Sequence, residues 1–114
     1  MRLLRAFLLL LVLGFAPRVD AVDFMRGDSN GDGGYNIADA IYTLSYLFID
    51  GAAPPCLDAA DVNDDGVIDL ADPVFLLSTL KPVGQPLIVP EPFNVCGEDP
   101  TIDGLTCDLY TPCP

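Results

Sequence analysis

The sequence predicts a small, mainly α protein in which two loop–helix repeats pack antiparallel and an irregular tail is held by disulfides. Residues 27–47 align without gaps with residues 60–80, at a constant offset of 33. Each copy ends in apolar residues spaced as on one face of a helix, and three of the four cysteines lie in the proline-rich tail. We expect a leader at 1–21, a repeat domain at 22–81 with repeats at 28–48 and 61–81, and a tail at 82–114.

The first 21 residues have the features of a secretory signal peptide. Arg2 and Arg5 precede an apolar run of about ten residues, which is shorter than the roughly 20 residues of a membrane span. We expect cleavage after Ala21, with Ala16 as the alternative, and a secreted protein that is extracellular or associated with the cell surface. A signal anchor that stays in the membrane is the alternative interpretation.

The charge of the chain excludes several classes of partner. Three of the five basic residues and one of the 17 acidic residues lie in 1–21, so residues 22–114 carry two basic and 16 acidic side chains, a net charge of −14. Such a chain repels nucleic acid phosphates and anionic membranes and attracts cations. We therefore expect no nucleic acid partner and, after leader cleavage, no membrane.

The cysteines predict two disulfides, because an even number in a small exported chain forms bridges that compensate for a thin core. Three pairings are possible. A cysteine zinc site is the alternative, although the chain has no close C-x₂-C pair and no histidine. We expect the tail to wrap irregularly over the helices, with a linker or a disordered end as the alternative. The cysteines are Cys56, Cys96, Cys107 and Cys113.

The repeats predict two helices with matching apolar faces. These faces were expected to supply the aliphatic side chains of a thin core between the repeats. Their members pair as Ile37 with Leu70, Ile41 with Val74, Leu44 with Leu77 and Leu47 with Leu80.

The segment that opens each repeat has the pattern of an EF-hand-type calcium loop. Such a loop needs oxygen ligands at positions 1, 3 and 5, a glycine at 6, a backbone carbonyl at 7, a water-mediated ligand at 9 and an acid at 12. Two calcium ions are therefore predicted, and solvated Asx turns that cap helices without a metal are the alternative. The predicted ligands are Asp28, Asn30, Asp32, Gly34, Asn36 and Asp39 in the first loop, and Asp61, Asn63, Asp65, Val67, Asp69 and Asp72 in the second.

The duplicated loop "DSNGDGGYNIAD" and "DVNDDGVIDLAD", each ending in aspartate and followed by a single helix, resembles a type I dockerin over residues 24–81. The tail stretch "CGEDPTIDGLTC" also resembles dockerin-like repeats of bacterial secreted proteins. The resemblance implies two F-hand repeats folded by calcium and a cohesin-like or other extracellular protein partner. Dockerins attach secreted proteins, often enzymes of polysaccharide metabolism, to a scaffold or cell surface. Loop positions 10 and 11 help select that partner in the family, and here they are Ile37, Ala38, Leu70 and Ala71.

Two features depart from the dockerin pattern. Tyr35 occupies loop position 8, where an aliphatic residue is usual and the second loop has Ile68. Lys81 is the only basic residue near either helix, whereas dockerin binding faces are often flanked by basic residues.

The sequence predicts a binding module and not an enzyme, because it lacks histidine, a G-x-S-x-G elbow and a phosphate-binding G-K-[ST] motif. The alternatives are a stand-alone calcium-binding structural protein without a dedicated partner, and a truncated C-terminal module of a larger carbohydrate-active enzyme. Exposed apolar side chains around loop positions 10 and 11 would favour the docking module.

Two smaller features stay open at this level. Arg26, Gly27 and Asp28 spell an adhesion-like tripeptide, but Asp28 is also a predicted ligand. Four aromatic residues are either core or interface: Tyr42, Tyr46, Phe48 and Phe75.

Overall fold

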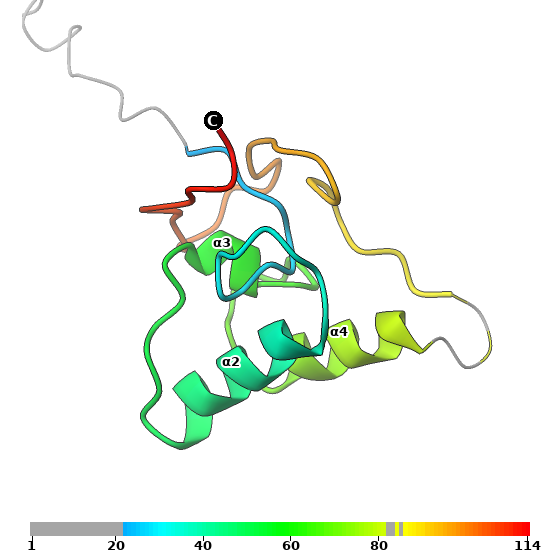
Figure 1. Ribbon diagram of the computed structural model, residues 1–114. Coiled ribbons are helices and arrows are strands. Elements are labelled where there is room, and N and C mark those ends of the chain that lie inside the picture. The colour runs from blue at the N-terminus through cyan, green and yellow to red at the C-terminus, as the bar shows by residue number, and fades with distance from the viewer. Residues whose placement is uncertain (1–21, 82–83, 85) are drawn as a thin grey trace, which may run out of the picture.

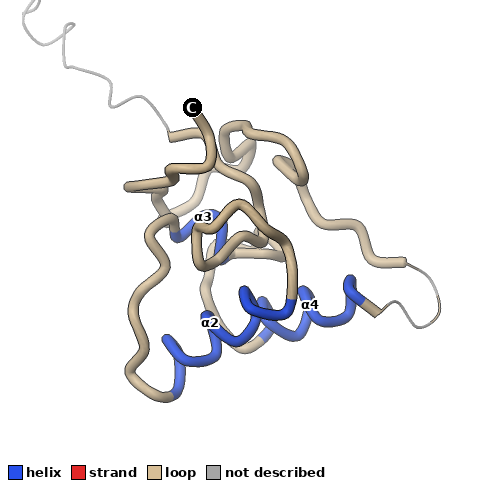
Figure 2. Tube along the Cα trace, viewed as in Figure 1, coloured by secondary structure: helices blue, strands red, loops and turns tan. Residues whose placement is uncertain are grey.

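The computed structural model describes residues 22–81, 84 and 86–114, so the predicted leader and its cleavage site lie outside the described residues. Within those ranges the chain forms three helices and no strand (Figures 1 and 2): α2 (Ile37–Phe48), α3 (Leu57–Ala60) and α4 (Ala71–Leu80). The prediction of a helical protein with two disulfides is confirmed. The helices of the described part are all too short or too polar to cross a membrane.

Helix α2 begins where local side-chain hydrogen bonds replace the missing helical ones. The Asn36 side chain accepts from the Ala38 N–H, and the Asp39 carboxylate accepts in return from the Asn36 N–H. These reciprocal bonds form a capping box, which satisfies amide groups that the first turn leaves free. In α4, Pro73 lies in the first turn, where a missing N–H costs nothing.

Helices α2 and α4 lie side by side and share one core cluster (Figure 1). The buried members are Ala40 from α2, Leu76 from α4, Val62 from the segment between α3 and α4, and Val89 from the tail. Ala40 is small, which allows the helices to approach closely at this point.

Most of the predicted apolar faces point outward, so the expectation that they form the core is wrong for six of their eight members; Leu44 and Leu47 are half-buried. Ile37 and Ile41 are 58% and 56% exposed, and Val74 is 51% exposed. The cause is Asp39, which lies on α2 but turns its carboxylate back into the loop and is fully buried. Successive helical residues are about 100° apart, so residues two positions before and after Asp39 point to the opposite side. Asp72 orients α4 in the same way.

A second core cluster joins the N-terminal segment, α3 and the tail, and consists of Phe24, Cys56, Ala59 and Tyr110. The tail is irregular and is pinned by two disulfides, Cys56–Cys107 and Cys96–Cys113, which are one of the three possible pairings. All four cysteines are thereby used, so the alternative of a cysteine zinc site is wrong.

The tail packs mainly on α3 and the N-terminal segment, and less on the helix pair than expected. Phe24 and Gly97 form an isolated β-bridge between the N-terminal segment and the tail. Earlier in the tail, Val89 and Phe93 belong to or pack against the α2–α4 cluster. The segment 86–114 is therefore an ordered part of the fold and not a free linker.

The four aromatic residues divide between core and surface. Phe75 packs against the α2–α4 cluster, whereas Tyr46 and Phe48 are 36% and 64% exposed. The Tyr42 hydroxyl donates to the Ala53 carbonyl at 3.1 Å.

The adhesion-like tripeptide is not accessible in this fold. Arg26 is 1% exposed and Asp28 is 2% exposed. A receptor could not reach either side chain without unfolding this segment.

Candidate metal centre

The first loop folds around the carboxylate of its first residue. Asp28 accepts the N–H of Asp32 at Oδ1 (3.2 Å) and that of Gly33 at Oδ2 (2.8 Å). Gly33 has φ of +86°, a conformation that glycine adopts without steric cost. The twelfth residue, Asp39, closes the loop by accepting the N–H groups of residues 30 and 36.

The second loop repeats these contacts 33 residues later. Asp61 accepts the N–H of Asp65 at 3.2 Å and of Gly66 at 2.9 Å. Asp72 accepts from Asn63 and Asp69, as Asp39 does from their counterparts. The sequence repeat therefore corresponds to a repeat in hydrogen bonding, residue by residue.

Each loop brings three carboxylates together. One carboxylate oxygen from each residue lies within 4.8 Å of the other two in both groups. The first group is Asp28, Asp32 and Asp39, and the second is Asp61, Asp65 and Asp72. These are the predicted ligands at positions 1, 5 and 12.

The remaining predicted ligands lie at the rim of the loops. The amides at position 3, Asn30 and Asn63, each donate to the position-5 carboxylate, at 3.3 Å and 3.2 Å. The position-7 residues, Gly34 and Val67, donate their N–H groups to the same carboxylates. At position 9, Asn36 accepts from the backbone N–H two residues on, and Asp69 does the same.

Burial without an ion pair sets the electrostatics of both loops. Asp39, Asp61 and Asp72 are fully buried. Burial raises the pKa of Asp39 and of Asp72 to about 7 and that of Asp61 to about 6, although backbone N–H donors oppose the rise. Among the described residues, the ion pairs of Arg26 go to Asp64 and Asp99, and no ion pair reaches these three carboxylates.

The donor chemistry fits a hard metal ion. Carboxylate, amide and carbonyl oxygens suit calcium, magnesium or manganese, whereas softer metals prefer nitrogen and sulfur. A divalent cation would also offset the charge that burial leaves uncompensated. The twelve predicted ligands could therefore hold such an ion in each loop.

The tail completes the surroundings of the first loop, and no sequence pattern predicted this contact. The Tyr110 hydroxyl, which is buried, donates to Asp28 Oδ2 at 2.5 Å from a position 82 residues further along the chain. Pro112 lies against Gly33, where a Cβ would meet its side chain at 3.6 Å. The loop is therefore enclosed on one side by the tail.

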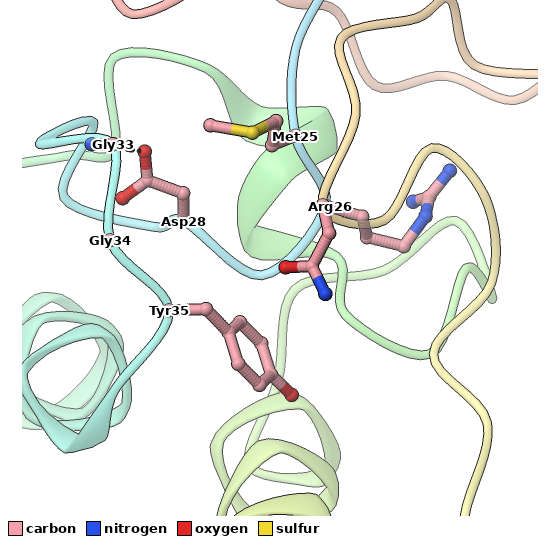
Figure 3. Close-up of a pocket in the computed structure, with 7 residues that line it drawn as sticks. Met25, Arg26, Asp28, Gly33, Gly34 and Tyr35 are labelled. Atoms are coloured by element: carbon pink, nitrogen blue, oxygen red, sulfur yellow. Dashed lines mark hydrogen bonds between the residues drawn. The ribbon is translucent and has the colours of Figure 1, made fainter.

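A cavity of about 30 Å³ lies beside the first loop and is lined by Met25, Arg26, Asp28 and Tyr35 among others. Figure 3 shows the Asp28 carboxylate turned toward Gly33 and the Arg26 side chain extending away from it. Small-molecule sites have volumes of roughly 300–1,000 Å³, so this cavity admits water and not an organic substrate.

The predicted partner-contact residues lie at the start of the two helices and are exposed. Ile37 is 58% and Leu70 is 51% exposed, and the two alanines that follow them are exposed as well. Charged side chains do not cover these positions, which distinguishes them from an ordinary solvated helix start.

Comparison with known proteins found no family model, no curated protein and no solved structure that matches the chain.

Proposed function

We propose that the protein is a non-catalytic, secreted docking module of the dockerin type that binds two calcium ions. In this proposal the two loops are F-hands, and the opposite chain directions of α2 and α4 in Figure 1 support an antiparallel pairing of the repeats. The partner is a cohesin-like or other extracellular protein. Two disulfides support an oxidising, extracellular setting.

The observation that carries the proposal is a coupling present in both repeats. Each acidic loop is followed at once by an exposed apolar pair, Ile37–Ala38 and Leu70–Ala71. Contiguous exposed apolar side chains rimmed by polar groups are typical of protein interaction sites. A calcium-binding structural protein without a partner would have no use for two such matching pairs.

Calcium titration of the exported, oxidised chain tests the metal half. We expect Asp28→Ala and Asp61→Ala each to remove one bound ion, because each deletes the position-1 ligand of one loop. Calorimetry counts the ions and far-ultraviolet circular dichroism follows helix content. Equal helicity in calcium and in chelator, with no heat of binding, would leave the loops as Asx turns without a metal.

A pull-down from the producer's secretome tests the docking half. We expect proteins captured in calcium to be released by chelator and to be lost with the double variant Ile37→Ser, Leu70→Ser. The control is Ile102→Ser, which removes a fully exposed apolar side chain from the tail. Capture that persists in the double variant would refute docking at this face, and no capture at all would favour the stand-alone structural protein.

A further inference from the structure

A third acidic cluster lies outside the two loops, where α3 meets the tail. One carboxylate oxygen from each of Asp58, Asp99 and Asp103 lies within 4.8 Å of the other two. Asp58 is on α3, whereas Asp99 and Asp103 belong to one turn of the tail. None of the three is a predicted ligand of either calcium loop.

Two oxygens in this cluster are buried without a hydrogen-bond donor. Asp58 is 7% exposed, and its Oδ1 has no hydrogen-bond partner among the described residues. Asp103 Oδ2 is likewise buried and unpartnered. A buried polar atom without a hydrogen-bond partner destabilises the fold, and more so when it is charged, so these oxygens indicate a ligand.

The local charge has the same implication. The buried Arg26 guanidinium pairs with Asp99 at 3.0 Å and with Asp64 at 3.6 Å. Asp64 in turn groups with Asp103 and with Asp61, the first predicted ligand of the second loop. One positive charge therefore lies among five carboxylates, and Lys81, the other basic residue of 22–114, is exposed at the end of α4. A divalent cation would offset part of the remaining negative charge.

The tail turn that supplies two of these aspartates shares part of the pattern that opens the two acidic loops, although Asp99 accepts the N–H of Thr101 and not those of the fifth and sixth residues. The stretch "DPTIDG" at 99–104 has oxygen side chains at its first, third and fifth positions and a glycine at the sixth. The Leu105 N–H donates to Asp103 Oδ1 at 2.9 Å, the same bond that Gly34 and Val67 make in the loops. The Cys56–Cys107 disulfide holds this turn against α3.

We propose that Asp58, Asp99 and Asp103 form a third site for a hard divalent cation such as calcium, because every donor is an oxygen. The ion would link α3 to the tail beside the disulfide. None of these three residues is a predicted ligand of the loops, but Asp103 also groups with Asp61, so the site adjoins the second loop and is separate from the first. A proton on Asp58 is the competing occupant.

Native mass spectrometry of the exported, oxidised chain in saturating calcium tests the proposal. The wild type is expected to hold three ions, and Asp58→Asn to hold two, because the variant removes one charge and keeps the side-chain volume. Asp108→Asn is the matched control: it removes an exposed carboxylate from the same tail and is expected to keep three ions. Asp103→Asn is the second variant if the circular dichroism spectrum shows that Asp58→Asn misfolds.

Each result has a defined meaning. A wild-type chain that binds no ion overturns the proposal without any variant and leaves a proton as the occupant. Equal ion counts for the wild type and folded Asp58→Asn, or folded Asp103→Asn, also overturn it. Failure of the loops is a separate outcome: Asp28→Asn and Asp72→Asn would then leave the count unchanged, while an ion sensitive to Asp58→Asn would remain.

Discussion

Arg26 holds the N-terminal segment, α3 and the tail together, and its replacement by methionine gives the sharpest test of the fold. Its guanidinium donates to the carbonyls of Asp58 (3.3 Å) and Asp61 (2.9 Å), to those of Pro90 (3.1 Å) and Glu91 (3.0 and 3.2 Å), and to the Asp99 carboxylate at 3.0 Å. The Arg26 side chain has no exposed surface. Methionine keeps most of the apolar stem but none of these donors.

We expect Arg26→Met to lower the free energy of unfolding by at least about 3 kcal/mol. Removing one partner of a buried ion pair costs about 3–5 kcal/mol, because the other charge stays buried without compensation. With a urea m-value of roughly 1–3 kcal/mol/M for a small domain, the midpoint should fall by about 1 M or more. Urea unfolding of the oxidised chain in calcium measures this shift.

The matched control is Lys81→Met, which removes the other basic side chain of residues 22–114 from an exposed position. A surface change of this kind is expected to stay within about 0.5 kcal/mol. If Arg26→Met shifts the midpoint no more than Lys81→Met does, the carbonyls and Asp99 are satisfied by water, and the central role of Arg26 is refuted.

Three further outcomes follow from the same contacts. Without metal, stability should fall as the pH rises from about 4 to about 7. Burial raises the folded-state pKa of Asp39 and Asp72 from 3.8 to about 7, so the folded form binds more protons than the unfolded form across that window. Urea midpoints in metal-stripped buffer measure this change, and a midpoint that rises with pH would contradict it. Tyr110→Phe should cost about 1–3 kcal/mol in the same buffer, since it deletes a donor to a charged oxygen; an unchanged midpoint would mean that water replaces the hydroxyl. Replacing both cysteines of Cys96–Cys113, which closes 17 residues, should cost about 3 kcal/mol by loop entropy, and thermal unfolding that matches the wild type would show that tail packing alone suffices.

The two loops were predictable because their interactions are local. The hydrogen bonds from backbone N–H groups to the first and twelfth carboxylates of the first loop join residues within positions 28–39, and the second loop repeats them. Spacing alone therefore placed Asp28, Asp32 and Asp39 in one cluster. The spacing of apolar residues likewise predicted the helical class, and the even number of cysteines in an exported chain predicted two disulfides.

The rest depended on contacts between distant parts of the chain, which spacing does not encode. Tyr110 reaches Asp28 across 82 residues and Arg26 reaches Asp99 across 73. The cysteine pairing was one of three that the sequence left open. The role of Arg26 could have been predicted in part, because a lone arginine in an acid-rich segment is a natural partner for buried carboxylates.

The outward orientation of the apolar face could also have been predicted from the sequence. It connects metal binding in the loops with the proposed docking surface. Once Asp39 is assigned to the loop as its closing ligand, its side of α2 must face inward, and Ile37 and Ile41 must point away. Asp72 imposes the same orientation on α4. In the proposed function, the ion in each loop is held in part by one of these aspartates and fixes the rotation of the helix that follows, and hence the geometry of the exposed face. Calcium dependence of docking would then follow from which way the helices turn, without any ligand contact between the ion and the partner.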